Sequence, residues 1–199
     1  MKTRKFVIAA SVALAVAGFT RQPAALAGAA HAVHCRIAGT TFTTAMDLDG
    51  DGSDQTSVAT YQGRANMSPY RGQGVSEAKP TPGTGCSLNP SSQSSCTLGS
   101  VTNACQYDYV AGFSANRDDA TGDIETFKRA SGSLCIDFTS GPPFKVAGTV
   151  TDNITGGTGP FAGATGSITT QVWGEILGMD PEGRGFGWYK GIGEGTISK

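Results

Sequence analysis

Glycine recurs at every second position near the C-terminus, and this pattern restricts the folds open to the chain. From Gly185 to Gly195, one set of alternate residues consists of glycines and Tyr189, and the other set consists of larger side chains. A period of two residues is that of a β-strand, in which successive side chains point to opposite faces. In a barrel, the glycine face either leaves room for a ligand or receives bulky side chains from facing strands, and small barrels commonly do the second.

The rest of the chain also favours an all-β fold. Glycine accounts for 29 of the 199 residues, Ser and Thr are abundant, and long helix-forming runs are lacking. About eight strand-like segments follow one another, separated by turn sequences such as DGDGSD and NRDDATG. We predict a single antiparallel β-barrel of about eight strands over residues 33–199, with a long surface loop at 79–100.

Residues 1–32 have the composition of a secretory signal peptide. Basic residues precede the apolar run FVIAASVALAVAGF, and small residues follow it. The run is shorter than the about 20 residues that a membrane-spanning helix needs, and no later segment is apolar enough to span. Cleavage after Ala27 or after Ala32 fits the pattern, and we place it at Ala32. We expect a secreted protein, extracellular or periplasmic, with no membrane span after cleavage.

Removal of this segment makes the chain acidic. The segment holds four of the 15 basic residues and none of the 16 acidic ones, so 11 basic and 16 acidic residues remain, a net charge of −5. An acidic chain without a cluster of Lys and Arg argues against nucleic acid and anionic membranes as partners.

The stretch GGTGPFAGATG at 156–166 has the spacing of a dinucleotide-binding loop without its context. Residues 157–162 match G-x-G-x-x-G/A, but that loop needs a helix after the glycines, and here Pro160 and a strand-like sequence follow. We interpret the glycines as turn residues that allow positive φ and close backbone approach, with a phenylalanine closing the sheet end. These turn residues are Gly156, Gly157, Gly159, Phe161, Gly163 and Gly166.

The longer string ITGGTGPFAGATGSI at 154–168 resembles the glycine signature of the dirigent and allene oxide cyclase-like proteins, most closely their small secreted bacterial members. The resemblance implies an antiparallel β-barrel of eight strands. Plant members steer the coupling of phenoxy radicals or cyclise an unstable epoxide, so it also implies a barrel that holds a reactive apolar molecule without a cofactor. The family's catalytic acidic, arginine and asparagine residues lie outside the signature, and we assign none of them to a position here.

Residues for common catalytic mechanisms are scarce. The two histidines, His31 and His34, provide too little for a Ser-His-Asp triad or a multi-histidine metal site, and the motifs G-x-S-x-G, H-E-x-x-H and C-x-x-C do not occur. Asp118 and Asp119 are typical of a solvated turn rather than of a glycosidase pair. We expect no cofactor, with calcium as the one alternative.

That alternative is the stretch DLDGDGSD, which has the D-x-D-x-D-G spacing of the first half of a calcium loop. The twelfth position is Val58, where such a loop needs a bidentate glutamate, and Asp-Gly is also common in hairpin turns. We therefore favour a plain turn over a calcium site. The candidate ligands are Asp47, Asp49, Asp51 and Asp54.

Five cysteines in an oxidising compartment predict disulfides with one thiol left over. If a hairpin turns about Asp119 and Ala120, Cys105 falls opposite Cys135, within bonding geometry. The predicted pairs are Cys105 with Cys135 and Cys86 with Cys96, which leaves Cys35 unpaired.

Large side chains on the proposed hairpin and beside the glycine strand are the candidates for a ligand pocket. They are Tyr107, Tyr109, Phe113, Phe127, Arg129, Trp173 and Tyr189. An arginine on an inward face needs an acceptor, because a buried unpaired charge costs several kcal/mol. Arg129 would then orient a polar group of an apolar ligand. The sequence favours the other interpretation, in which this face is solvated and Arg129 is a surface charge.

These patterns lead to three hypotheses about function. The first is a barrel that binds a small apolar or aromatic molecule, with cofactor-free cyclase or stereochemical-guiding activity. The second is a non-enzymatic extracellular structural or surface protein with a filled barrel. The third is a calcium-dependent binding module. A cavity of a few hundred Å³ favours the first hypothesis, and a packed interior favours the second.

Overall fold

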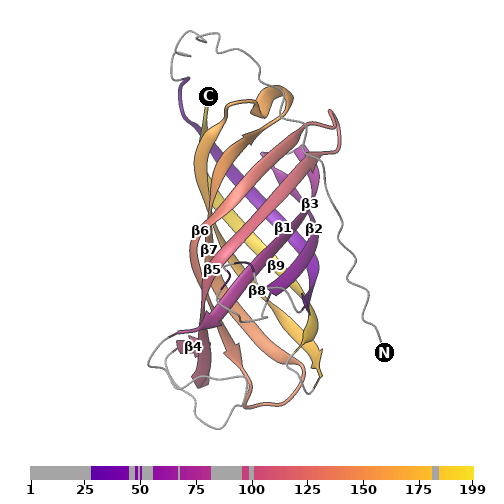
Figure 1. The fold of residues 1–199 in the computed structure, drawn as a ribbon, viewed down its shortest axis with the longest axis vertical. Coiled ribbons are helices and arrows are strands. Elements are labelled where there is room, and N and C mark those ends of the chain that lie inside the picture. Colours follow the sequence, from indigo (N-terminus) through magenta and orange to yellow (C-terminus); the bar gives the residue numbers. More distant parts are fainter. Residues whose placement is uncertain are drawn as a thin grey trace, which may run out of the picture.

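The computed structural model describes residues 28–44, 48, 50, 56–66, 68–81, 96–98, 101–180 and 184–199, and these residues form one closed antiparallel β-barrel of eight strands (Figure 1). Neighbouring strands follow the order β3-β2-β1-β9-β8-β7-β6-β5, and pairing of β3 with β5 closes the barrel. The barrel strands are β1 (His31–Thr44), β2 (Thr56–Ala65), β3 (Ser68–Pro80), β5 (Val101–Asp118), β6 (Ile124–Asp137), β7 (Phe144–Gly157), β8 (Thr165–Met179) and β9 (Gly185–Ser198). The prediction of a single all-β barrel is confirmed.

One short strand lies inside the segment that the sequence predicted to be a loop. This strand, β4 (Cys96–Leu98), pairs with the start of β5 and is not one of the eight barrel strands. In the part of the chain that the structure describes, no helix is long and apolar enough to cross a membrane.

The glycine face of β9 points into the barrel. Gly187, Gly191 and Gly193 are buried, whereas the alternate residues Phe186 and Ile192 are exposed. The space in front of these glycines belongs to the barrel interior, as the period of two requires when one face is inward.

Inward tyrosines lie opposite glycines on the neighbouring strands. Tyr61 of β2 pairs with Gly72 of β3 and with Gly39 of β1, and Tyr189 of β9 also pairs with Gly39. A methyl group added at Gly72 would overlap the Tyr61 ring, so this ring lies across the glycine and over the neighbouring strand. Glycine is therefore needed at Gly72 because it leaves room for a neighbour's ring.

One end of the barrel is closed by the turn that contains the glycine signature. A 3₁₀ helix, η1 (Gly159–Phe161), connects β7 to β8, and Gly159 and Gly163 have φ of 51° and 73°, which favour glycine. Phe161 packs against a buried cluster at this end. The cluster consists of Val33, Cys35, Phe127, Ile154, Ala164 and Ile168.

The start of β1 bears on the predicted cleavage site. β1 begins at His31, and Ala32 already pairs with Thr196 of β9, so cleavage after Ala32 would remove part of the strand. Cleavage after Ala27 keeps these backbone hydrogen bonds. If the predicted segment is removed, we therefore expect the N-terminal sequence of the mature protein to begin at Gly28, and a first residue beyond Ala32 would show this expectation to be wrong.

Candidate ligand-binding cavity

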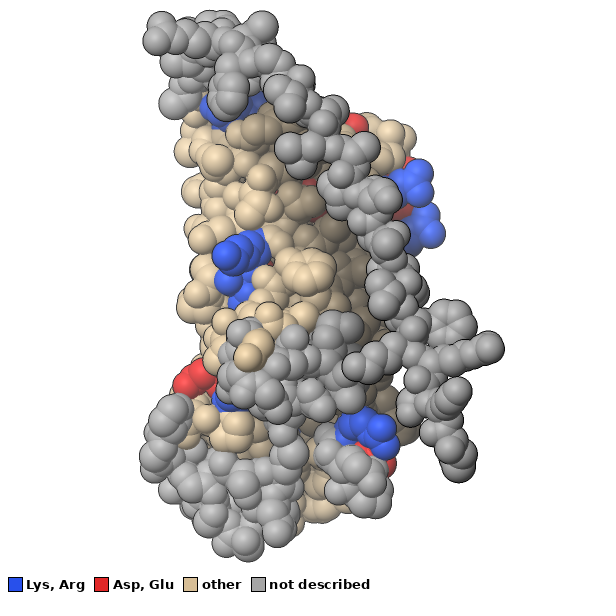
Figure 2. Space-filling view, in the orientation of Figure 1, with Lys and Arg blue, Asp and Glu red and all other residues tan. Residues whose placement is uncertain are grey.

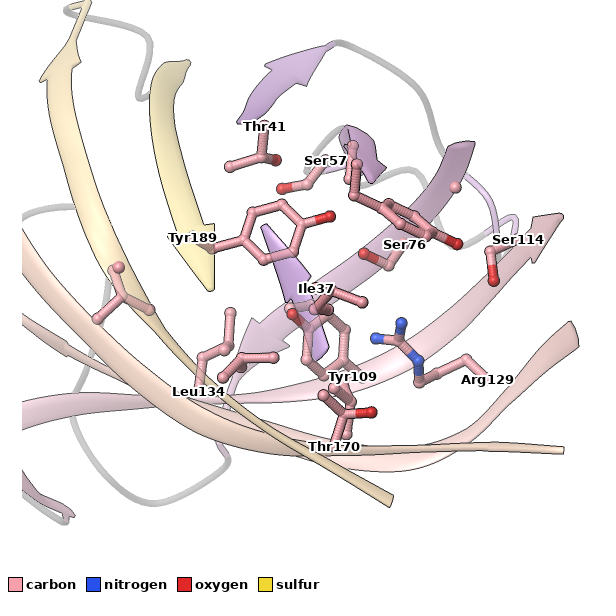
Figure 3. A pocket seen from close by; sticks show the side chains of 18 of the residues that line it. Ile37, Thr41, Ser57, Ser76, Tyr109, Ser114, Arg129, Leu134, Thr170 and Tyr189 are labelled. Atoms are coloured by element: carbon pink, nitrogen blue, oxygen red, sulfur yellow. The ribbon is translucent and has the colours of Figure 1, made fainter. Parts of the chain in front are cut away.

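The barrel contains a cavity of about 280 Å³ that is lined by residues of all eight barrel strands (Figure 3). Hydroxyl groups line the side formed by β1, β2 and β3, and they belong to Thr41, Thr43, Ser57 and Ser76. Apolar side chains of β6, β7 and β8 also line the cavity, and they include Leu134, Ile136, Val146, Val172 and Ile176. The charged side chains of Glu125, Arg129 and Asp152 lie on the same strands. A cavity of this size, lined by both polar and apolar groups, suits a small amphipathic molecule.

Arg129 extends into this cavity from β6. Its Nε donates a hydrogen bond to Asp152 Oδ1 at 2.6 Å, and its guanidinium carbon lies 4.3 Å from the centre of the Tyr109 ring. The Arg129 and Asp152 side chains are 14% and 21% exposed, and the two residues are register partners on β6 and β7. The favoured interpretation of Arg129 as a surface charge is therefore wrong, and the residue belongs to the barrel interior (Figure 3).

Arg129 remains charged in this position. Burial by itself lowers the pKa of the guanidinium, but the charge of Asp152 and the Tyr109 hydroxyl raise it, and the net shift is upward. One of its nitrogens, Nη1, is buried and makes no hydrogen bond. A buried donor without a partner is uncommon in folded proteins, so Nη1 is a candidate donor to a ligand's acceptor.

Glu125 is a second ionisable group of the cavity, on the same inward face of β6. Its register partners are Asn116 on β5 and Gly157 on β7. Burial raises the pKa of its carboxyl to about 7. Among the described residues it forms neither a hydrogen bond nor an ion pair, in contrast to Asp152.

Tyrosine rings form much of the wall around these groups. Burial raises the pKa of Tyr61 to about 12 and also raises the pKa of Tyr70, Tyr109 and Tyr189, so all four hydroxyls stay protonated near neutral pH. The Tyr61 hydroxyl donates a hydrogen bond to Asn116 Oδ1 at 2.8 Å.

All seven predicted pocket residues are among those that line the cavity, and five of them, Tyr107, Tyr109, Phe127, Arg129 and Tyr189, have mostly buried side chains. The other two, Phe113 and Trp173, are 62% and 40% exposed, so much of each side chain faces solvent. The sequence prediction put Tyr109 and Phe113 on one face. This is wrong because the register with β3 shifts at Glu77/Ala78, which leaves Val110 as an extra residue of β5 and reverses the faces beyond it.

The sequence prediction missed Asp152, Glu125, Tyr61 and Tyr70. A signal for Asp152 exists in the alternate residues of β7, which run from Val146 through Gly148 and Val150 to Asp152 and Ile154. A single carboxylate on an otherwise apolar strand face indicates a buried partner. The pattern does not show which arginine pairs with Asp152, because this depends on strand register.

The structure corrects the disulfide prediction. Cys96 is bonded to Cys135, which links β4 to β6 and contradicts both predicted pairs. Cys105 lies opposite Ile136, and Cys135 lies opposite Gln106, so the register differs by one residue from the predicted one. A slip of one residue moves a side chain to the other face, and Cys105 points inward while Cys135 points outward.

The remaining cysteine and calcium predictions have mixed outcomes. Cys35, predicted to be unpaired, is a buried thiol. Cys86 and the candidate calcium ligands Asp47, Asp49, Asp51 and Asp54 lie outside the described residues. Within the described ranges, no group of three or more His, Cys, Asp or Glu side chains could hold a metal ion.

Charged side chains on the outer surface are dispersed. Figure 2 shows basic and acidic residues in small separate groups on this face, with uncharged surface between them. Exposed ion pairs include Arg71 with Asp119 and Arg184 with Asp180. Exposed pairs of this kind contribute little to stability.

Comparison with protein-family models, curated proteins and solved structures finds no match to this chain. The fold and the cavity therefore define its class by themselves: a closed β-barrel of eight antiparallel strands with a charged pair inside.

Proposed function

We propose that the barrel binds a small apolar or aromatic molecule in its central cavity and that Arg129 donates a hydrogen bond to an oxygen of that molecule. The buried Nη1 of Arg129, which makes no hydrogen bond, is the observation that carries this proposal. Asp152 and the Tyr109 ring hold the guanidinium from two sides, so the donor is positioned before the ligand arrives.

The cavity supports a small ligand rather than a large one. Its volume of about 280 Å³ lies just below the range for small-molecule sites, which begins at about 300 Å³. The polar groups that lie among aliphatic side chains suit a molecule with a few polar atoms on an apolar body.

The proposal also covers the location of the protein and the kind of reaction that its cavity would guide. The N-terminal composition and the disulfide between Cys96 and Cys135 support an extracellular or periplasmic location. The resemblance of residues 154–168 to dirigent and allene oxide cyclase-like proteins supports a barrel that guides a reactive apolar molecule. Arg129 and Asp152 would orient such a molecule, and no step requires a cofactor.

Native mass spectrometry of protein purified from its source tests binding, with one variant that fills the cavity and one that does not. Ala59 lines the cavity, and the next residue, Thr60, is exposed on the outer face of the same strand. We expect the unmodified protein and Thr60→Phe to carry the same small-molecule adduct, and Ala59→Phe to have lost it. Circular dichroism checks that both variants are folded.

The same experiment separates ligand binding from a structural role. A folded protein without an adduct in any variant, or an adduct that Ala59→Phe retains, would contradict binding in this cavity. The tyrosine rings that lie across glycines already fill part of the interior, so a barrel packed by its own side chains is the outcome that would replace the proposal.

A further inference from the structure

Glu125 lies at a second polar position of the cavity, separate from the pair formed by Arg129 and Asp152. The two residues are four positions apart on β6, a spacing of roughly 13 Å along an extended strand. Both line the same cavity, and Phe127 lies between them on the same inward face. A ligand that extends from Arg129 along β6 therefore reaches Glu125.

One tyrosine side chain extends toward this carboxyl, and a second tyrosine packs against the first. Tyr61, Gly72, Asn116 and Glu125 form one continuous row of register partners across β2, β3, β5 and β6. Because Gly72 has no side chain, the Tyr61 ring crosses β3, and its hydroxyl reaches Asn116, the neighbour of Glu125. The Tyr70 ring packs edge-on against Tyr61, with centroids 6.4 Å apart and an interplanar angle of 82°.

The charges of the cavity leave Glu125 uncompensated among the described residues. Arg129 and Asp152 neutralise each other at 2.6 Å. The charge of Glu125 acts on three groups, Cys35, Tyr61 and Tyr70. Burial is the main cause of their raised pKa values, and the negative charge of Glu125 raises these values further. All three are neutral at neutral pH, so an anionic ligand would meet only repulsion at this position, whereas a cation would meet a carboxylate and two aromatic rings.

We propose that Glu125, Tyr61 and Tyr70 form a subsite for the ammonium group of a small basic ligand. The carboxylate pairs with the cation, and the tyrosine rings contact it through their π systems, which carry a negative electrostatic potential on their faces. This proposal rests on the proposed function and specifies its ligand: a small amine with an apolar or aromatic body.

Binding of a cation at this subsite is linked to pH. Burial raises the pKa of Glu125 to about 7, so below this pH the carboxyl holds a proton that it must release when an ammonium group binds. Affinity for the amine therefore rises about tenfold per pH unit below pH 7 and levels off above it. A neutral ligand of the same shape shows no such rise.

A matched pair of probes tests the subsite: 2-(2-naphthyl)ethylamine and its alcohol counterpart, 2-(2-naphthyl)ethanol. Isothermal titration calorimetry of the full mature protein at pH 5, 6, 7 and 8 measures both affinities. We expect the amine to bind about 100-fold more tightly than the alcohol at pH 8, about tenfold more tightly at pH 6, and to lose most of this preference at pH 5. Titrations at pH 6 in two buffers of different ionisation enthalpy should show the release of about one proton per amine bound.

Two variants assign the preference to one carboxyl. Glu125→Gln keeps the shape of the side chain, and we expect it to bind amine and alcohol equally at all four pH values. Glu194→Gln removes an exposed carboxylate of β9 that lies near His34, and we expect the preference of the unmodified protein to be retained. If Glu125→Gln does not fold, proton release in the unmodified protein decides the question.

The outcomes separate the two proposals. Alcohol binding without any amine preference at pH 8, or a preference that survives in Glu125→Gln, would overturn the ammonium subsite and leave the cavity proposal intact. If neither probe binds and the protein from its source carries no adduct, both proposals fail.

Discussion

Replacing Asp152 with asparagine is expected to lower the free energy of unfolding by about 3 kcal/mol, because the change leaves the Arg129 charge buried without a counterion. The two side chains are mostly buried and joined at 2.6 Å, so water cannot replace the lost partner as it does at the surface. Urea denaturation followed by tryptophan fluorescence measures the change.

The exposed pair of Arg184 and Asp180 provides a matched control. Its N···O distance of 2.7 Å is similar, but its side chains are 51% and 34% exposed. Asp180→Asn should therefore cost less than about 1 kcal/mol. In the interior, the double variant Asp152→Asn with Arg129→Met should be more stable than the sum of the single changes predicts, by about 1–3 kcal/mol. Equal effects at the two pairs would contradict a buried position for Arg129.

Removing the disulfide with Cys135→Ser is expected to lower the free energy of unfolding by roughly 2–4 kcal/mol, because the bond between Cys96 and Cys135 closes a loop with a sequence separation of 39. An open loop of this length has more conformational freedom in the unfolded state. Urea denaturation with and without a reducing agent measures the loss.

A second readout identifies the bond itself. Reduction should destabilise the unmodified protein and leave Cys135→Ser unchanged. Peptide mapping under non-reducing conditions should recover Cys96 linked to Cys135, and a link between Cys105 and Cys135 would contradict the register of β5 and β6 described above.

Local patterns were enough to predict the barrel and which residues of the last strand share a face. The alternation from Gly185 to Gly195 depends on only one strand, and its period predicts which residues share a face. The glycine turn at 156–166 is equally local, since the backbone conformation of Gly159 and Gly163 is one that glycine adopts readily.

Features that depend on pairing between strands could not be predicted in this way. The extra residue at Val110 reverses the faces of β5, so Tyr109 points inward and Phe113 outward, and no sequence pattern shows where such a bulge occurs. The turn between β5 and β6, held by Gly122 N–H to Asp118 O, sets a register one residue away from the predicted one. The contact of Arg129 with Asp152 depends in turn on the register of β6 with β7, which only the folded barrel defines.

The first and last strands of the chain are partners, and this pairing affects when the barrel can close. β1 pairs with β9 over most of its length, from His31 with Ile197 to Phe42 with Phe186. A chain that leaves the ribosome with its N-terminus first therefore holds β1 with one edge unpaired until β9 has been made. Contacts between such distant segments raise the contact order and slow folding. Closure of the barrel is thus a late step in folding. A protein that lost β9 would have open sheet edges instead of a closed interior.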